Sequence, residues 1–96
     1  DALTHHPAVK ECAVVASPHE IRGNIVKAFV ILNEGYKASD DLVKTLQDFT
    51  KKTVAPYKYP RAIEFVEDLP KTNSGKIRRV ELRDAERQKY NQQFKQ

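Results

Sequence analysis

The sequence predicts an α+β domain in which helices flank a small sheet, antiparallel or mixed. Three observations predict this class. Two apolar runs, residues 12–16 and 25–32, are rich in β-branched side chains and are too short for typical helices. Residues 40–53 repeat apolar side chains at helical spacing. Residues 79–93 are polar and compatible with a second helix, which we expect to be peripheral because its apolar stripe is weak.

The apolar runs lie within two expected strands, residues 9–18 and 25–34, which we predict to be buried on both faces. The connecting residues 17–24 contain the proline, glycine and asparagine that are typical of loops. We therefore expect an antiparallel pair joined by a long loop, with Arg22 at its exposed end.

The helix predicted over residues 40–53 has a clear beginning and end. Ser39 is a typical N-cap residue, and the two aspartates after it suit the positive end of the helix dipole. Lys51 and Lys52 lie in the last turn, where cations are favoured. The apolar positions of this helix are Leu42, Val43, Leu46 and Phe49.

The remaining elements follow in order. Residues 55–60 contain two prolines and end the helix, and residues 62–66 are expected to form a strand. Residues 69–76 are almost all turn-forming. The helix predicted over 79–93 has a weak stripe formed by Val80, Leu82 and Ala85, and expected surface pairs Asp84/Arg87 and Glu86/Tyr90.

The chain has 96 residues, enough for one small domain with a modest core, so we expect any active site to be shared with another part of the protein. It contains no methionine, and we interpret it as a piece of a longer protein. No window approaches 18 apolar residues, so we predict a soluble piece with no membrane partner. The single Cys12 is expected to be buried and inert, which fits a reducing compartment, either cytoplasm or an organelle matrix.

The charge is unevenly distributed along the chain. Residues 1–50 carry five Lys or Arg against seven Asp or Glu, a balance of −2. Residues 51–96 carry twelve against six, a balance of +6. This asymmetry predicts an anionic partner for one face, which is nucleic acid, a membrane surface or a phosphorylated small molecule. Charge alone does not choose among them.

The basic residues of the segment 70–79 surround a Ser74-Gly75 turn. A glycine lets the backbone approach a ligand, and a neighbouring lysine suits phosphate or carboxylate oxygens. The segment is not a P-loop, because Pro70 occupies the first glycine position and Ile77 follows Lys76. A solvated loop is the alternative. The cations concerned are Lys71, Lys76, Arg78 and Arg79.

This segment, PKTNSGKIRR, closely resembles the signature loop of the C-terminal domain of AMP-forming acyl-CoA synthetases, members of the adenylate-forming enzyme superfamily. Three other segments occur in that family's order, and the likeness extends over essentially the whole chain. They are HPAV at residues 6–9, RG at 22–23 leading into VKAFV at 26–30, and APYKYPR at 55–61 before IEFV at 63–66. The tyrosine-rich turn with the IEFV strand is most similar to the medium-chain acyl-CoA synthetase branch.

The resemblance implies that residues 1–96 are the mobile C-terminal domain, and that a large N-terminal adenylation domain and a hinge lie outside them. It implies that Lys76 is the catalytic lysine of the first half-reaction, in which a carboxylate attacks the α-phosphorus of ATP and pyrophosphate leaves. Such a cation offsets the repulsion between two approaching anions. Ser74 and Gly75 would complete the adenylate loop. The isolated domain is expected to be inactive.

In the second half-reaction the resemblance implies that the domain turns to hold coenzyme A for thioester formation. The positions similar to that family's CoA contacts are Arg22, Lys51 and Tyr59. ATP and CoA are then substrates, and Mg²⁺ accompanies ATP without being bound by this domain. We expect no metal site, because His5, His6 and His19 lack a ligand spacing.

Alternatives stay open at each position. The structural alternatives are Lys76 as a solvated turn residue, Arg22 as a loop charge, Lys51 as a helix-dipole partner and Tyr59 as a packing residue. The functional alternative is a nucleic-acid-binding or anionic-surface-binding module, because tyrosines that could stack on bases lie among basic residues. These residues are Lys51, Lys52, Tyr57, Lys58, Tyr59 and Arg61. A relative that transfers adenylates or acts on a carrier-protein pantetheine is a third.

The likeness of the tyrosine-rich turn favours free CoA over a carrier-protein pantetheine as acceptor. We expect no nucleic-acid partner, and a cytoplasmic location, or the mitochondrial matrix in a eukaryote. A protein acetyltransferase acting on Lys76 is a further expected partner, because acetylation removes the charge.

Overall fold

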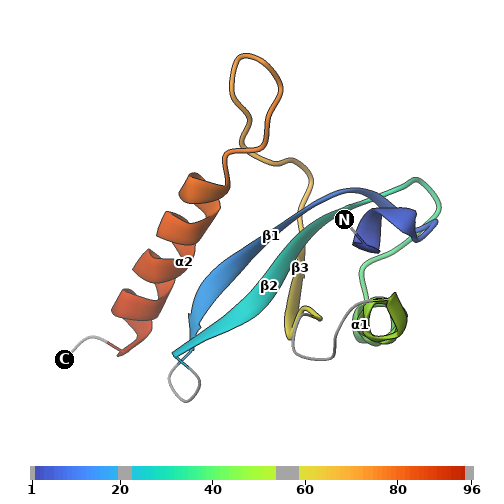
Figure 1. Ribbon diagram of the computed structural model, residues 1–96, viewed down its shortest axis with the longest axis horizontal. Coiled ribbons are helices and arrows are strands. Elements are labelled where there is room, and N and C mark those ends of the chain that lie inside the picture. The colour runs from blue at the N-terminus through green and yellow to red at the C-terminus, as the bar shows by residue number, and fades with distance from the viewer. Residues whose placement is uncertain (1, 20–22, 54–58, 95–96) are drawn as a thin grey trace.

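The computed structural model describes residues 2–19, 23–53 and 59–94 (Figure 1). The predicted CoA contact Arg22 therefore lies outside the described residues, as does the turn over residues 54–58. The elements in chain order are the 3-10 helix η1 (Ala2–His5), strands β1 (Val9–His19) and β2 (Gly23–Leu32), helix α1 (Asp40–Thr53), strand β3 (Ala62–Phe65) and helix α2 (Arg79–Phe94).

The three strands form one mixed sheet in the order β1-β2-β3. β1 and β2 are antiparallel, in a register that runs from Val9 opposite Leu32 to His19 opposite Gly23. β2 and β3 are parallel, because helix α1 carries the chain back across the sheet between them. The predicted α+β class is confirmed. Of the two sheet types that the sequence allowed, antiparallel or mixed, the structure has the mixed one.

The prediction of a long loop over residues 17–24 is wrong for most of that segment, because strands β1 and β2 extend into it. Ser17, Pro18 and His19 pair with residues 25, 24 and 23 of the opposite strand. A proline is tolerated here because β1 has a neighbour on one side only, and half of its amide groups face away from that neighbour. The left-handed backbone of Gly23, with φ of 78°, opens β2.

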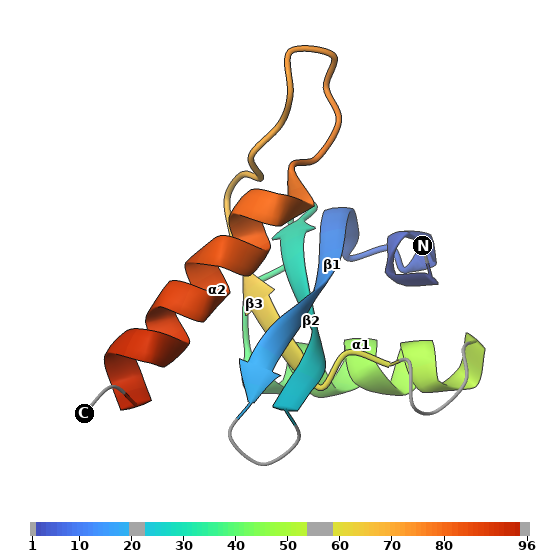
Figure 2. The ribbon, with the colours of Figure 1, turned by 60° about the vertical axis from the view of Figure 1, so that its left-hand side comes forward.

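Alternating side chains of the strands enter two separate cores, as a fully covered sheet requires. Helix α2 covers one face of the sheet, and η1 and α1 cover the other (Figures 1 and 2). On the face covered by η1 and α1 the buried side chains are Leu3, Val9, Cys12, Ala28, Val30 and Leu46. On the face covered by α2 they are Ala13, Val15, Phe29, Ile31 and Leu69. The prediction that both strands are buried on two faces is confirmed.

Helix α1 has the predicted bounds. The hydroxyl of Ser39 accepts a hydrogen bond from the Leu42 amide at 3.0 Å, which is the expected N-cap interaction. Leu46 is fully buried against the sheet. Among the described helices, none is long and apolar enough to cross a membrane.

Helix α2 does not bury the stripe that its sequence predicts. Leu82 packs into the core, but Val80 is 46% exposed and Ala85 is also exposed. Glu86, expected on the surface, is only 6% exposed. The reason lies in the sheet, where Lys27 supplies a partner for its carboxylate. The predicted surface pair Asp84/Arg87 is present, at 4.0 Å.

Candidate functional site

The segment 70–78, called the Lys76 hairpin below, is a narrow backbone loop. Its two arms form an antiparallel bridge between Lys71 and Ile77. The Thr72 amide donates to the Lys76 carbonyl at 2.8 Å, and the Gly75 amide donates to the Thr72 carbonyl at 2.9 Å. Gly75 has a φ of 86°, a conformation that favours glycine. These bonds fix the backbone on both sides of Lys76.

The hydroxyl groups of the tip add to this structure. The Thr72 hydroxyl accepts a hydrogen bond from the Lys76 amide at 3.2 Å and lies 3.0 Å from the Ser74 hydroxyl. Ser74, Gly75 and Lys76, the predicted adenylate loop, are therefore adjacent members of one hydrogen-bonded turn.

The hairpin is anchored at its base and exposed at its tip. Leu69 is 4% exposed, and Ile77 packs against the same core. Residues 71–76 are all exposed, and the hairpin projects from the body of the domain (Figures 1 and 2). This arrangement holds Lys76 away from the sheet and exposes it to solvent.

Lys76 differs from two neighbouring cations in its contacts. Lys71 is ion-paired with Glu11 at 2.9 Å, and Arg78 is ion-paired with Glu81 at 3.0 Å. Lys76 has no ion pair among the residues that the structure describes. Its ammonium group is thus available to an anionic ligand.

The structure brings two predicted CoA contacts together. The Nζ atom of Lys51, in the last turn of α1, lies 4.6 Å from the ring centroid of Tyr59. The guanidinium carbon of Arg61 lies 5.2 Å from the same centroid. Both are cation–π distances. Lys51, Tyr59 and Arg61 are called the Tyr59 cluster below.

Backbone contacts hold the Tyr59 cluster between α1 and β3. The side-chain amide of Gln47 donates to the carbonyls of Pro60 and Arg61 at 3.1 and 3.2 Å. The Arg61 amide donates to the Val26 carbonyl of β2 at 2.9 Å. Lys51 and Arg61 are exposed, while Tyr59 is half-buried. Two cations are therefore presented to solvent on a fixed aromatic support.

Arg61, which the sequence links only to the nucleic-acid alternative, lies beside Tyr59 in the structure and was not predicted as a CoA contact. The available signal was its spacing, because side chains two residues apart in an extended segment point to the same side. Arg61 follows Tyr59 at that spacing, just before β3.

The two regions lie at opposite ends of the domain. The hairpin extends from one end of the sheet, while α1 and the beginning of β3 lie at the other (Figures 1 and 2). A cleft of about 480 Å³ contains none of the predicted site residues; it is lined by Lys10, Ile31, Leu32, Ala38, Phe65, Val66 and Glu67. The two regions are thus separate surfaces at opposite ends of the domain.

A buried ion cluster beneath α2 was not predicted. The Lys27 ammonium lies 2.7 Å from Oε1 of Glu86 and 3.0 Å from Oε1 of Glu64, and the Ser17 hydroxyl donates to Glu86 at 3.0 Å. Burial alone would raise the pKa of Glu86, but the hydrogen bond and charge of Lys27 outweigh it and hold that pKa below its ordinary value. We assign this cluster a structural role, since it joins β2, β3 and α2.

Cys12 and His6 both make structural contacts within the fold. Burial raises the pKa of the Cys12 thiol, consistent with the expected inert side chain. His6 accepts a hydrogen bond from the Ala8 amide at 3.1 Å and packs edge-on against Phe49. The described part of the chain contains no group of three or more His, Cys, Asp or Glu side chains placed to hold a metal ion.

Known proteins resemble this chain in sequence and in structure. The model of the AMP-binding enzyme C-terminal domain matches residues 1–76. The uncharacterized acyl-CoA ligase YtcI of Bacillus subtilis (strain 168) is 69% identical over 92% of this chain and 17% of its own length. The mitochondrial acyl-coenzyme A synthetase ACSM3 of Homo sapiens is 58% identical over 90% of this chain and 15% of its own length.

The crystal structure of the Brucella canis acyl-CoA synthetase superposes with a TM-score of 0.90 at 50% identity, over 93% of this chain and 16% of that one. The chain spans less than a fifth of the length of these relatives. The resemblance inferred from the four sequence segments is confirmed by these matches. The chain belongs to the family of AMP-binding enzyme C-terminal domains.

Proposed function

We propose that this chain is the catalytic lid domain of an ATP-dependent, AMP-forming acyl-CoA synthetase, which converts a carboxylic acid, ATP and CoA into acyl-CoA, AMP and pyrophosphate. The observation that carries the proposal is the exposed hairpin that presents Lys76 away from the sheet with no ion pair among the described residues. Residues 1–96 belong to the C-terminal domain in this proposal. The large N-terminal adenylation domain and the hinge lie outside them, so the domain alone is inactive.

In the adenylation step Lys76 enters the active site of the large domain. The carboxylate oxygen of the acid attacks the α-phosphorus of ATP, and the bond to pyrophosphate breaks. The Lys76 ammonium lies between the two anions and stabilises the charge that their approach concentrates. The turn formed by Ser74 and Gly75 holds the backbone at Lys76, so little reorganisation is needed during the reaction.

In the thioester step the opposite end of the domain faces the active site. Lys51 and Arg61 bind phosphate groups of CoA, and Tyr59 supports both cations and offers its ring edge or hydroxyl to the adenine end. Arg22 contributes a further cation in this proposal. The separation of the Lys76 hairpin from the Tyr59 cluster supports two successive orientations, because one docking surface cannot present both ends at once.

The finer features of the proposal rest on likeness to the medium-chain branch. The acid is a medium-chain carboxylic acid, the acceptor is free CoA, and Mg²⁺ accompanies ATP in the large domain. The location is cytoplasmic, or the mitochondrial matrix in a eukaryote. A protein acetyltransferase acting on Lys76 regulates the enzyme. The relatives reported above are named as acyl-CoA ligases or synthetases and give no support to the nucleic-acid-binding alternative.

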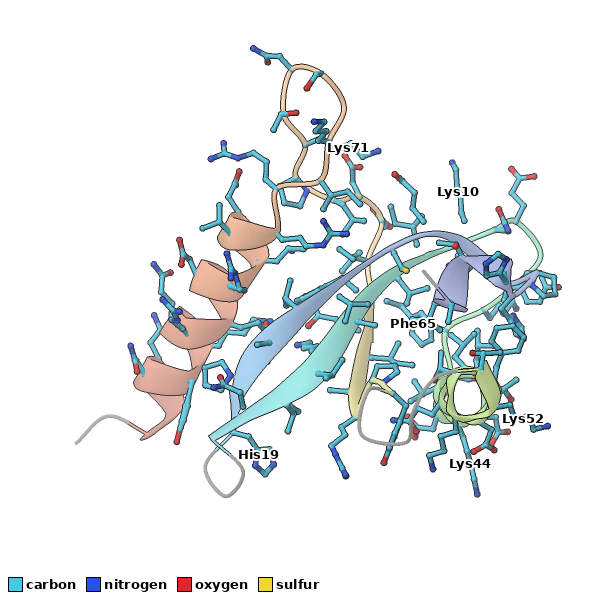
Figure 3. The ribbon with its side chains drawn as sticks, viewed as in Figure 1. Lys10, His19, Lys44, Lys52, Phe65 and Lys71 are labelled. Atoms are coloured by element: carbon cyan, nitrogen blue, oxygen red, sulfur yellow. The ribbon has the colours of Figure 1, made fainter. Side chains whose placement is uncertain are left out.

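The test is Lys76→Ala in the complete enzyme, assayed separately for the two half-reactions. We expect acid-dependent pyrophosphate exchange to fall about a hundredfold to a thousandfold, the usual loss for a well-placed charge-stabilising donor. Thioester formation from preformed acyl-adenylate should remain. Lys44→Ala is the matched control, because Lys44 is exposed on α1 and points away from the sheet (Figure 3). Survival of both half-reactions in Lys76→Ala would contradict the proposal.

A further inference from the structure

The Lys76 hairpin is tied to the edge strand by one ion pair. Lys71 lies at the base of the hairpin (Figure 3). Its Nζ atom lies 2.9 Å from Oε1 of Glu11 in β1. Both side chains are 35% exposed. The pair connects positions 60 residues apart in the sequence. It therefore fixes the hairpin relative to the sheet rather than stabilising a local turn.

Glu11 occupies a rigid position on the strand. The next two residues, Cys12 and Ala13, are both buried, one in each core. The register of β1 against β2 shifts between Val9 and Glu11, and such irregularities re-aim a side chain. Glu11 is thus held by the packing of β1 and offers a fixed carboxylate to the hairpin.

Lys71 transmits this constraint to the catalytic position. It forms the backbone bridge with Ile77, the residue after Lys76, and the Thr72 amide next to it bonds the Lys76 carbonyl. Apolar packing of Leu69 and Ile77 anchors the base, but such contacts are non-directional. The ion pair restricts the orientation of the hairpin relative to the sheet, because the Lys71 ammonium must stay next to the Glu11 carboxylate.

We propose that Glu11 is a positioning residue for adenylation, which acts through Lys71 to orient the Lys76 hairpin as it enters the active site. This inference rests on the proposed function. The pair is partly exposed, and such pairs contribute modestly, so its loss corresponds to a change of about two- to fivefold in rate. The change falls on kcat rather than KM, because Lys76 acts in the transition state.

The experiment compares Glu11→Gln with Glu67→Gln in the complete enzyme. Glu67 is an exposed glutamate close to the hairpin in sequence, with no ion pair among the described residues. We expect Glu11→Gln to lower kcat of adenylation about two- to fivefold, with KM for ATP and acid unchanged and thioester formation from preformed acyl-adenylate unaffected. Glu67→Gln should match the parent enzyme in both half-reactions.

The charge swap Glu11→Lys with Lys71→Glu separates positioning from general loss of stability. It rebuilds the pair in reverse and should recover most of the adenylation rate, whereas Glu11→Lys alone should lower it further. Equal losses in both half-reactions, a loss no larger than that of Glu67→Gln, or no recovery in the swap would overturn the inference.

Lys76→Ala distinguishes the two proposals. If it abolishes adenylation while Glu11→Gln does not change it, the positioning role alone is wrong. If Lys76→Ala leaves adenylation intact, both proposals are wrong.

Discussion

The Nζ atom of Lys27 in β2 lies 2.7 Å from Oε1 of Glu86 in α2, and this buried ion pair joins the sheet to the helix that follows the Lys76 hairpin. The side chains are 13% and 6% exposed. Glu64 on β3 also lies within 3.0 Å of the same ammonium group. Three elements therefore meet at one lysine.

Removal of one partner from this pair should destabilise the domain. Glu86→Ala leaves Lys27 buried with Glu64 alone, and we expect the free energy of unfolding to fall by about 2 to 4 kcal/mol. The double variant Lys27→Met with Glu86→Leu should be close to the parent, because apolar side chains of similar volume replace the buried pair. Glu64, which also loses Lys27, is partly exposed and keeps Lys89 as an ion-pair partner at 3.3 Å. Urea unfolding followed by circular dichroism measures both. A Glu86→Ala variant as stable as the double variant would contradict the buried-pair explanation.

The same cluster predicts a dependence of stability on pH. Burial would raise the pKa values of Glu64 and Glu86, but their hydrogen bonds and ion pairs hold those pKa values below the ordinary 4.5. A lowered pKa contributes stability that is fully present above 4.5 and is lost as the pH falls through the folded-state value. The difference in unfolding free energy between the parent and Glu86→Gln should thus be constant above about pH 5.5 and shrink at lower pH. A difference independent of pH would exclude this linkage.

Substitutions in the Tyr59 cluster should weaken CoA binding without affecting adenylation. Arg61→Ala and Lys51→Ala each remove a cation held over the Tyr59 ring, so we expect KM for CoA to rise about tenfold, the usual effect of losing one charged hydrogen bond. Pyrophosphate exchange should not change, since CoA takes no part in it. Steady-state kinetics with Lys44→Ala as the control makes the comparison. An unchanged KM in both variants would remove the cluster from the CoA site.

Gly75→Ala tests whether the left-handed turn holds Lys76 in place. A Cβ atom at Gly75 would meet no atom within 4 Å, so the cost comes only from the backbone φ of 86° and is about 1–2 kcal/mol. Gly35→Ala is the matched control, because Gly35 has a φ of 92° and equally open surroundings but lies before α1. We expect similar losses of stability in the two variants.

Only Gly75→Ala should lower the adenylation rate, about ten- to a hundredfold, because it moves the turn that carries Lys76. The two half-reactions of both variants are measured alongside their thermal unfolding. Equal adenylation rates in the two variants would show that the turn conformation does not matter to Lys76.

Acetylation of Lys76 should stop adenylation by removing its charge. Stoichiometric acetylation of that residue, verified by mass spectrometry, is expected to abolish pyrophosphate exchange and to leave thioester formation from acyl-adenylate intact. Full exchange activity in the acetylated enzyme would contradict the predicted regulation.

The sequence by itself determined the elements whose local signals and burial agree. The Ser39 cap and the apolar spacing through Leu46 predicted helix α1 with its observed bounds, since both signals are local. The β-branched runs predicted strands covered on both faces. The turn around Gly75 was also predicted, and Lys76 lies in it. The signal is local, because glycine is the residue that most easily adopts the left-handed backbone found at Gly75.

Only the tertiary structure decided the contacts between distant segments. Glu86 resembles any surface residue of a polar helix, and its burial depends on Lys27 of a strand 59 residues away. Pro18 resembles a loop residue, and its strand conformation depends on β1 being an edge. The pairing of Lys71 with Glu11 and of Lys51 with Tyr59 follows from the fold as well. The physical reason is the same in each case: charge and backbone conformation are stabilised by partners that local sequence does not identify.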